Sequence, residues 1–398
     1  MDFSRLPEEE AFQEEVRNWL AVNMKELPEW WTNPEILGPE VGSKERCQFD
    51  IWWHRKLYDA GFVGITWPKE YGGRGGTFMQ TVICNEELVK HRAPLPVNYF
   101  ALSFCGPTIM NFGTQQQKEL FLRNMLTAGE LWCEGFSEPE AGSDLASLQT
   151  HAVEDGDDYV VNGQKVWTSE GHFADWAILL ARTDTEAPKH RGISYFLLDM
   201  HSPGVTLRPL KQITGEADFN EMFLDNVRIP KSMMVGEKNK GWYVAMSTLD
   251  YERTGWRTIL QNINLLEDLI NLARKIEKNG ESVTKDPLVR QQLAQLYIEA
   301  NVAKYNELRS LTRQIRGERP GPEDMVSVLL GVESGQRLTD FAMQLLGPYG
   351  QLSPGSKYAI EQGRWQYNCL AWRCRTIAGG TSEIRRNVIA QRALGLPR

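Results

Sequence analysis

Apolar residues recur every three or four positions in the first third of the chain, which is the spacing of one face of a helix. One such stripe begins after Pro7, a residue suited to the first turn of a helix, and three glutamates follow it directly. Two further stripes cover residues 49–57 and 115–126. The pattern predicts an N-terminal helical domain over residues 1–130.

The pattern changes between residues 131 and 238, where short apolar runs alternate with Gly and Pro. Asn162-Gly163 separates two of these runs, and the dipeptide suits a type I′ turn because both central residues need positive φ angles. We therefore expect a hairpin turn there. Further strands are predicted at 176–182, 193–198 and 222–227. Together they indicate a small antiparallel β domain.

Helical spacing returns from residue 239 to the end of the chain. Long helices are predicted at 256–275, 287–315 and 323–346, and a final one at 381–394. This order of helices, a β domain and then a helical bundle over residues 239–398 predicts an α+β protein of several domains, as the length of 398 residues also suggests.

Composition removes several classes of function. The net charge is −8 and no Lys/Arg block is present, so we expect no nucleic-acid partner. The six cysteines form no Cys-x-x-Cys pair and the histidines lack helical metal spacing, so no metal site is predicted. No apolar run approaches the ~20 residues that span a bilayer. The first fifteen residues include six carboxylates, unlike a targeting peptide, and a cytoplasmic location is expected.

Three segments carry candidate chemistry, and each also has a plain structural interpretation. The loop 134–144 contains Ser137 and Ser143, whose hydroxyls suit ligand oxygens or a simple polar connection. Trp167 stands at a strand end and suits either the core or the edge of a cofactor ring. Two glycines precede Thr381, which can cap a phosphate-binding helix or serve as an ordinary cap.

In this order and over essentially the whole chain, these segments resemble the acyl-CoA dehydrogenase family. The motifs that carry the likeness lie at 67–73, 137–139, 165–167, 342–347 and 380–382. The resemblance implies an α+β fold with an N-terminal helical domain, a middle antiparallel β domain and a C-terminal four-helix bundle. It also implies FAD bound between the β domain and the bundle, oxidation of an acyl-CoA thioester to a trans-2-enoyl-CoA, and an electron-transfer flavoprotein as partner.

The resemblance also assigns roles to residues by position. It implies that the isoalloxazine is lined by Phe136, Ser137, Trp167 and Ser169. It implies that the adenosine diphosphate half of FAD lies against Thr381 and Glu383, and that Gln344 lies near the pyrophosphate of a neighbouring subunit's flavin. For the CoA arm it implies Asp250, Arg253 and Ser143, the last of these also among the cofactor-binding positions.

The chain departs from the family pattern at Gly379, where many members carry the catalytic Glu. Removal of a proton α to a thioester needs a base and hydrogen bonds to the carbonyl oxygen, and the Gly379 N–H can supply only the second. A subset of the family carries the base on a bundle helix instead, and Glu252 falls at that position. We therefore expect Glu252 to be the α-proton base, with a pKa raised by enclosure.

A second departure concerns an Arg-x-x-Phe-Gly segment whose Arg reaches the partner's FAD pyrophosphate in the family. Here Ile276 takes the Arg place and Asn279 the Phe place, although Arg274 or Lys275 could substitute. This combination resembles bacterial heterotetrameric members that act on bulky thioesters such as steroid side chains. We expect a heterotetramer with a related chain, and otherwise a homotetramer.

Two other functions stay open on the sequence alone. The chain could be a non-catalytic structural subunit of a heteromeric dehydrogenase, or an acyl-CoA oxidase whose flavin reacts directly with O₂.

Overall fold

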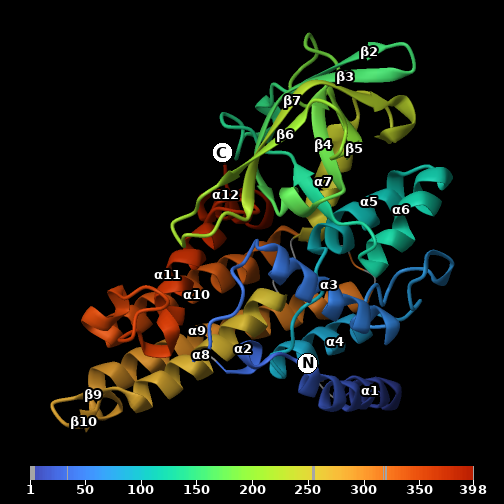
Figure 1. The fold of residues 1–398 in the computed structure, drawn as a ribbon. Coiled ribbons are helices and arrows are strands. Elements are labelled where there is room, and N and C mark those ends of the chain that lie inside the picture. The colour runs from blue at the N-terminus through green and yellow to red at the C-terminus, as the bar shows by residue number, and fades with distance from the viewer. Residues whose placement is uncertain (1–4, 34, 253–255, 317, 319–320, 398) are drawn as a thin grey trace. The chain divides into compact units, whose positions relative to one another are not determined.

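The computed structural model describes residues 5–33, 35–252, 256–316, 318 and 321–397, without the side chains of 250–252, 256–257 and 323 (Figure 1). Two compact units are present. The bundle unit consists of Met1–Gly38, Phe78–Pro94 and Arg253–Arg398, and the sheet unit of Pro39–Thr77 and Leu95–Glu252. The N-terminal helices therefore divide between the two units.

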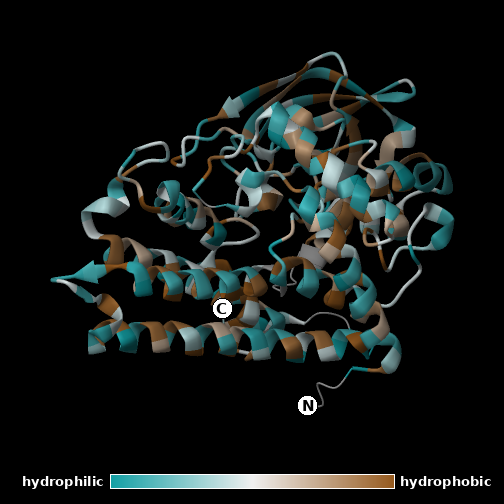
Figure 2. Cartoon of the chain, turned by 60° about the horizontal axis from the view of Figure 1, so that its bottom comes forward, coloured by the Kyte–Doolittle hydropathy of each residue, from teal (hydrophilic) through white to brown (hydrophobic). Residues whose placement is uncertain are grey.

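Three long helices form the centre of the bundle unit and pack against one another. They are α8 (Trp256–Lys275), α9 (Pro287–Ile315) and α10 (Met325–Leu346). Their positions confirm the helices predicted from apolar periodicity. In Figure 2, teal and brown residues alternate along the long helices, as expected when one face of each helix is buried. Fully buried Leu269, Leu338 and Trp365 lie in their common core.

Shorter helices complete the bundle unit. They are α1 (Pro7–Asn23), α2 (Glu29–Thr32), α4 (Phe78–Lys90), α11 (Arg364–Ala371) and α12 (Ser382–Val388). α1 begins at Pro7 as predicted and packs on α4, which in turn packs on α8. The buried Glu87 of α4 accepts a hydrogen bond from Arg17 of α1 at 2.9 Å. α11 was not predicted from the sequence.

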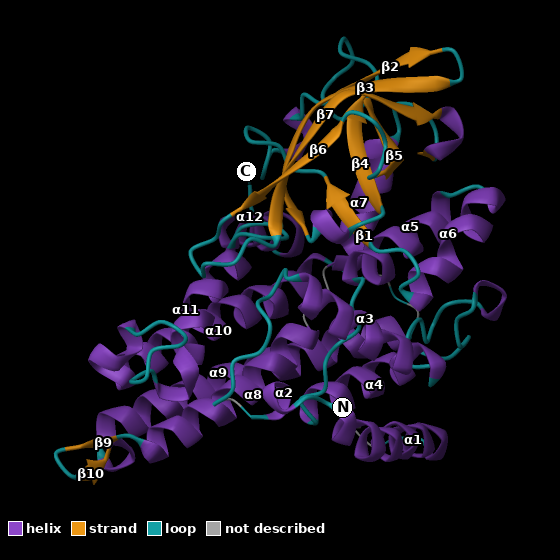
Figure 3. Ribbon diagram, in the orientation of Figure 1, coloured by secondary structure: helices purple, strands orange, loops and turns teal. Residues whose placement is uncertain are grey.

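A two-stranded hairpin joins α8 to α9 (Figure 3). Its strands are β9 (Glu277–Lys278) and β10 (Glu281–Ser282). The turn residues Asn279 and Gly280 have φ angles of 56° and 79°, the pair of positive values that a type I′ turn requires. This hairpin was not predicted, although its Asn-Gly dipeptide is the usual sequence signal for one.

Eight strands of the described chain form one sheet in the sheet unit, in the order β6-β7-β3-β2-β4-β5-β8 with β1 beside β4. Their bounds are β1 Trp132–Gly135, β2 His151–Asp155, β3 Asp158–Ser169, β4 Trp176–Arg182, β5 Ile193–Asp199, β6 Val205–Leu210, β7 Phe219–Pro230 and β8 Met234–Val235. β4 and β5 confirm two predicted strands. The sheet is mainly antiparallel, as predicted, but β4 runs parallel to β1 and, at one residue pair, to β2.

The prediction of a hairpin turn at Asn162-Gly163 is wrong. β3 continues through both residues, and the turn into β3 lies at Gly156 instead, where Asp155 of β2 pairs with Asp158. Gly163 serves close packing rather than a turn, because a Cβ there would lie 2.3 Å from Thr150 Oγ1. The dipeptide signal failed since it does not distinguish these two uses of glycine.

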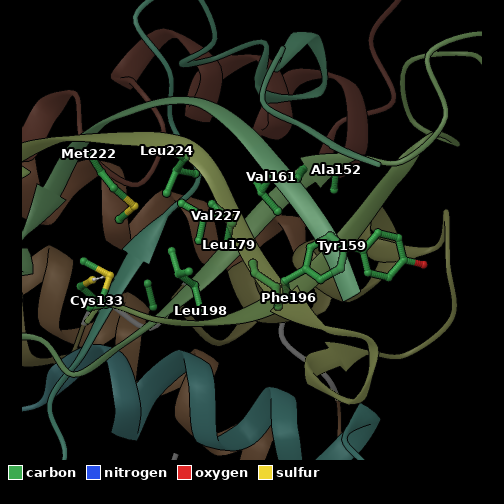
Figure 4. Close-up of a cluster of buried hydrophobic side chains, with 14 of the residues drawn as sticks. Cys133, Ala152, Tyr159, Val161, Leu179, Phe196, Leu198, Met222, Leu224 and Val227 are labelled. Atoms are coloured by element: carbon green, nitrogen blue, oxygen red, sulfur yellow. Dashed lines mark hydrogen bonds between the residues drawn. The ribbon is translucent and has the colours of Figure 1, made fainter. Parts of the chain in front are cut away.

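The core of the sheet unit lies against one face of the sheet. Figure 4 shows side chains from several strands meeting there, with the rings of Tyr159 and Phe196 in edge contact at a centroid distance of 5.0 Å. Val161, Leu179 and Met222 are fully buried beside them. Alternate residues of β3 point into this core, which fixes the direction of the residues at the far end of the strand.

Helices cover part of the same unit. They are α3 (Lys44–Asp59), α5 (Gly106–Phe112), α6 (Gln115–Thr127) and α7 (Gly241–Glu252), with a π-helical turn, η3 (Ala101–Cys105), before α5. α3 and α6 match predicted helices. α7 packs on β5, α5 and η3. Its first residue, Gly241, lies so close to β5 that a Cβ would be 2.4 Å from the Ser194 carbonyl carbon.

None of the helices in the described part of the chain is long and apolar enough to cross a membrane.

Candidate active site

The loop that follows β1 is held in place by hydrogen bonds from β3 to the carbonyl groups of its first two residues, Phe136 and Ser137. Phe136 is buried, and its ring forms a T-shaped pair with the ring of Tyr195 at a centroid distance of 5.9 Å. Its carbonyl oxygen accepts a hydrogen bond from Lys165 Nζ at 3.1 Å. The next carbonyl, of Ser137, accepts from the Val166 N–H at 2.9 Å. The loop therefore lies directly beside the end of β3.

Lys165 and Glu138 form a buried ion pair beneath this loop, with Nζ 2.8 Å from Oε1. Glu138 also accepts from the backbone N–H groups of Gln149 at 2.6 Å and Thr150 at 2.9 Å. Burial lowers the pKa of Lys165 to about 8, although Glu138 opposes that change. Burial raises the pKa of Glu138, but attraction to Lys165 and these hydrogen bonds bring its pKa below the ordinary value.

Trp167 is not a core residue. It has a φ of 64°, lies in an irregular stretch of β3 between Lys165 and Thr168, and is 60% exposed. Its ring forms a T-shaped pair with the ring of Phe219, at a centroid distance of 5.9 Å. Ser169 ends β3 two residues later and is half-buried. An exposed indole beside a fixed loop is the arrangement that a flat ring can lie against.

The predicted CoA contacts are described only in part. Ser143 is exposed in the loop after β1, next to Asp144, which is paired with Lys189 at 2.8 Å. Asp250 and Glu252 lie in the last turn of α7, but their side chains are outside the described residues, as is all of Arg253.

A pocket of about 490 Å³ in the bundle unit contains two of the predicted cofactor residues, Thr381 and Glu383. Its other lining residues are Glu333, Gln336, Arg337, Asp340, Thr376, Ile377, Ser382 and Arg386. Thr381 caps α12, as predicted, by accepting from the Ile384 N–H at 3.2 Å. The Ser382 Oγ is buried and has no hydrogen-bond partner within the described part of the chain.

Both arginines of this pocket are already paired with carboxylates. Arg337 donates to Glu299 at 2.8 Å, and Arg386 pairs with Glu333. The pocket therefore offers hydroxyl donors for ligand oxygens, whereas each of its two arginines is paired with a carboxylate. Gln344 lies exposed near the end of α10 and does not line the pocket.

Gly379 is exposed in the turn that precedes Gly380 and has a φ of 66°. This left-handed conformation is one that glycine adopts without a steric cost. The position retains a backbone N–H and no side-chain base.

Ile276 is half-buried and packs against the core of the bundle unit. The neighbouring cations point to other partners: Lys275 Nζ lies 3.6 Å from Glu361 Oε1, and Arg274 donates to Asn271 at 3.1 Å. The packing of Ile276 explains why an apolar residue is accommodated here.

Sequence reasoning missed the roles of Lys165 and Glu138, although both lie in the motifs that carried the resemblance. A signal was present. Lys165 is an even number of residues from Tyr159 and Val161, so it belongs to the buried face of β3. A lysine on such a face needs a buried partner.

Comparison with known proteins agrees with this geometry. Family models of the acyl-CoA dehydrogenase N-terminal, middle and C-terminal domains match residues 6–129, 133–227 and 239–394. The chain belongs to the acyl-CoA dehydrogenase family. It is therefore an oxidoreductase of the class that dehydrogenates acyl-CoA thioesters with FAD as cofactor, and this agrees with the predicted fold class.

Individual acyl-CoA dehydrogenases are similar over the full length. "Acyl-CoA dehydrogenase IpdE1" of Mycobacterium tuberculosis is 40% identical over 393 residues, covering 98% of each chain. The "Tcur3481-Tcur3483 steroid ACAD" is 30% identical with a TM-score of 0.86, covering 100% of each chain. The ChsE4-ChsE5 complex from Mycobacterium tuberculosis is 31% identical with a TM-score of 0.82, also over 100% of each chain.

The residues present fit a flavin. An exposed aromatic ring lies beside a fixed loop in the sheet unit, and an unpartnered hydroxyl lines a polar pocket in the bundle unit. Among the described residues, no group of three or more His, Cys, Asp or Glu side chains is placed to hold a metal ion.

Proposed function

We propose that this acyl-CoA dehydrogenase removes the α-proton of its thioester with Glu252 and releases a trans-2-enoyl-CoA. The observation that carries the proposal is the glycine at 379, whose φ of 66° suits a residue without a side chain. A dehydrogenase still needs a base, and Glu252 stands in the last turn of α7. FAD, when bound, accepts the hydrogen that leaves the β carbon as hydride.

The packing of α7 against α5 and β5 supports this role for Glu252. Thr248 is fully buried and its hydroxyl lies 2.8 Å from that of Thr108 on α5. The start of the helix is pressed against β5 at Gly241. These two contacts fix α7 at its start and at Thr248, four residues before Glu252, and a base needs a fixed helix in order to reach a single carbon atom.

In this proposal, Phe136, Ser137, Trp167 and Ser169 hold the isoalloxazine, and Thr381, Glu383 and Gln344 contact the adenosine diphosphate half of FAD. Ser143, Asp250 and Arg253 hold the CoA arm. The Gly379 N–H donates to the thioester carbonyl oxygen, where negative charge develops as the proton leaves. Domain boundaries near residues 130 and 238 belong to the same proposal.

We further propose a heterotetramer with a related chain that supplies a cation for the FAD pyrophosphate. Support comes from the packing of Ile276 in the bundle core, the acidic partners of Arg337 and Arg386, and the steroid dehydrogenase complexes among the similar structures. A bulky acyl group, an electron-transfer flavoprotein as acceptor and a cytoplasmic location complete the proposal. The six free cysteines agree with a reducing compartment.

The test is the Glu252→Gln variant in the complex obtained by co-expression with a related dehydrogenase chain. Loss of a catalytic base predicts a fall in kcat of about 10² to 10⁴ with FAD still bound. Unchanged turnover would instead support a non-catalytic structural subunit. Oxygen consumption without an added electron acceptor would identify an oxidase. A homotetramer that binds stoichiometric FAD and turns over acyl-CoA unaided would rule out the need for a second chain.

A further inference from the structure

The strongest feature without an assigned role is the buried lysine beneath the loop of Phe136 and Ser137. The side chains of Lys165 and Glu138 are 0% and 7% exposed, and Glu138 is the only charged partner within ion-pair distance of Lys165 in the described part of the chain. An ion pair taken out of water costs more desolvation energy than a packed apolar pair, so its presence calls for an explanation other than stability.

The geometry of the loop suggests that explanation. All peptide bonds of the described chain are trans, so the C=O and N–H of one peptide point in opposite directions. Lys165 Nζ binds the carbonyl of Phe136, and the N–H of the same peptide, which belongs to Ser137, must therefore point away from Lys165.

That N–H is available to a ligand. The neighbouring donors are used: the Val166 N–H binds the Ser137 carbonyl, and the Glu138 N–H binds the Ala141 carbonyl at 3.1 Å. No acceptor binds the Ser137 N–H among the described residues. Ser137 as a residue is half-buried, and a backbone N–H that is out of contact with water costs free energy unless an acceptor pairs with it.

We propose that Lys165 is a positioning residue for the flavin, whose ammonium group orients the 136–137 peptide so that the Ser137 N–H donates to a carbonyl of the flavin ring. The inference rests on the proposed placement of the isoalloxazine. Glu138 keeps the ammonium group charged in a buried site, and its bonds to Gln149 and Thr150 hold it in place. The positive charge at the carbonyl also polarises the peptide and strengthens its N–H as a donor.

The test compares the FAD affinity of the wild type with that of variants, each as the full chain purified in its native assembly. The flavin is removed and added back, and its binding is followed by fluorescence. Lys165→Met should weaken FAD binding at least about fivefold, the value of one ordinary hydrogen bond. The control is Arg228→Met, which removes an exposed cation that pairs with Asp155 and Asp158 at 2.9 Å on the same sheet. It should bind FAD like the wild type.

The pH dependence separates positioning from a merely structural role. Wild-type affinity should fall above about pH 8, where Lys165 loses its proton, and Lys165→Met should show no such step. Glu138→Gln should move the step to lower pH, because Lys165 then lacks its carboxylate. Lys165→Met affinity equal to that of the wild type, or a step at the same pH in all variants, would overturn the proposal.

A variant that fails to fold need not end the test. The double variant Lys165→Met/Glu138→Gln leaves no unpaired buried charge and retains an acceptor oxygen at 138. It should fold and bind FAD as weakly as Lys165→Met, and wild-type affinity in the double variant would refute the role of Lys165. The proposed function is judged separately, because unchanged turnover by Glu252→Gln refutes it whatever Lys165 does.

Discussion

Arg92 donates to both carboxylate oxygens of Asp268, at 2.9 and 2.7 Å, and so ties the segment after α4 to α8 inside the bundle unit. Arg364 donates to the same carboxylate at 3.1 Å. Since two arginines from distant parts of the sequence share one acceptor, Asp268 joins three segments of this unit. A fork-shaped contact of this kind is stronger than a single exposed ion pair.

Replacing Asp268 by Asn should destabilise the protein by about 1–2 kcal/mol, because the amide can satisfy neither arginine in full. The urea midpoint of unfolding measures the change. Glu267→Gln is the matched control, since it removes an exposed carboxylate from the neighbouring position of α8. Equal midpoints for the two variants would show that the Asp268 contacts contribute nothing.

Alanine at the two Asn-Gly sites should have different effects. At Gly163 a Cβ would lie 2.3 Å from Thr150 Oγ1 and 2.7 Å from its Cα, so the backbone must move, at a cost of about 2–3 kcal/mol. At Gly280 nothing lies within 4 Å, and the φ of 79° alone costs about 1 kcal/mol. Thermal unfolding of Gly163→Ala and Gly280→Ala measures both, and a larger loss at Gly280 would contradict the packing argument.

Stability should depend on pH through Lys165. The folded protein releases this proton near pH 8, whereas an unfolded chain holds it to about 10.5. Between these values the unfolded state binds more protons, so this group makes the free energy of unfolding rise with pH. Subtracting the profile of Lys165→Met from that of the wild type isolates the contribution. A difference that is flat from pH 8 to 10.5 would mean that the lysine titrates normally.

The buried hydroxyl pair on α7 gives a further prediction. Thr248→Val removes one hydroxyl and leaves that of Thr108 without its partner in a fully buried place, at a cost of about 1–2 kcal/mol. Tyr243→Phe removes an exposed hydroxyl from the same helix and should have little effect on stability. If α7 positions the base, Thr248→Val should also lower kcat more than it raises KM, and steady-state kinetics of both variants would reveal it.

Much of the fold could be predicted because its long elements carry strong local signals. α8 and α9 have clear apolar stripes, and their predicted bounds agree with the structure. Asn-Gly dipeptides were less informative. At 279–280 the dipeptide forms a hairpin turn, whereas at 162–163 it lies within a strand, where Thr150, the residue before β2, leaves no room for a side chain on Gly163. That distinction depends on tertiary contacts, which a local dipeptide does not contain.

The candidate site was predicted unevenly for a similar reason. Thr381 was expected to cap a helix, and it does, since a cap depends on residues three positions apart. Trp167 allowed both a core and a surface interpretation, and only the irregular pairing of β3 with β7 turns it outward. The ion pair of Lys165 and Glu138 joins residues 27 positions apart and needed the fold to be seen.

The half-buried Ile276 has an evolutionary consequence. Since its side chain packs against the bundle core, a single change to arginine would have to expel a cation from that core before it could serve any ligand. An arginine introduced at this position would therefore lower stability before it gave any benefit. Selection for a cation here would have to act on the neighbouring core residues first.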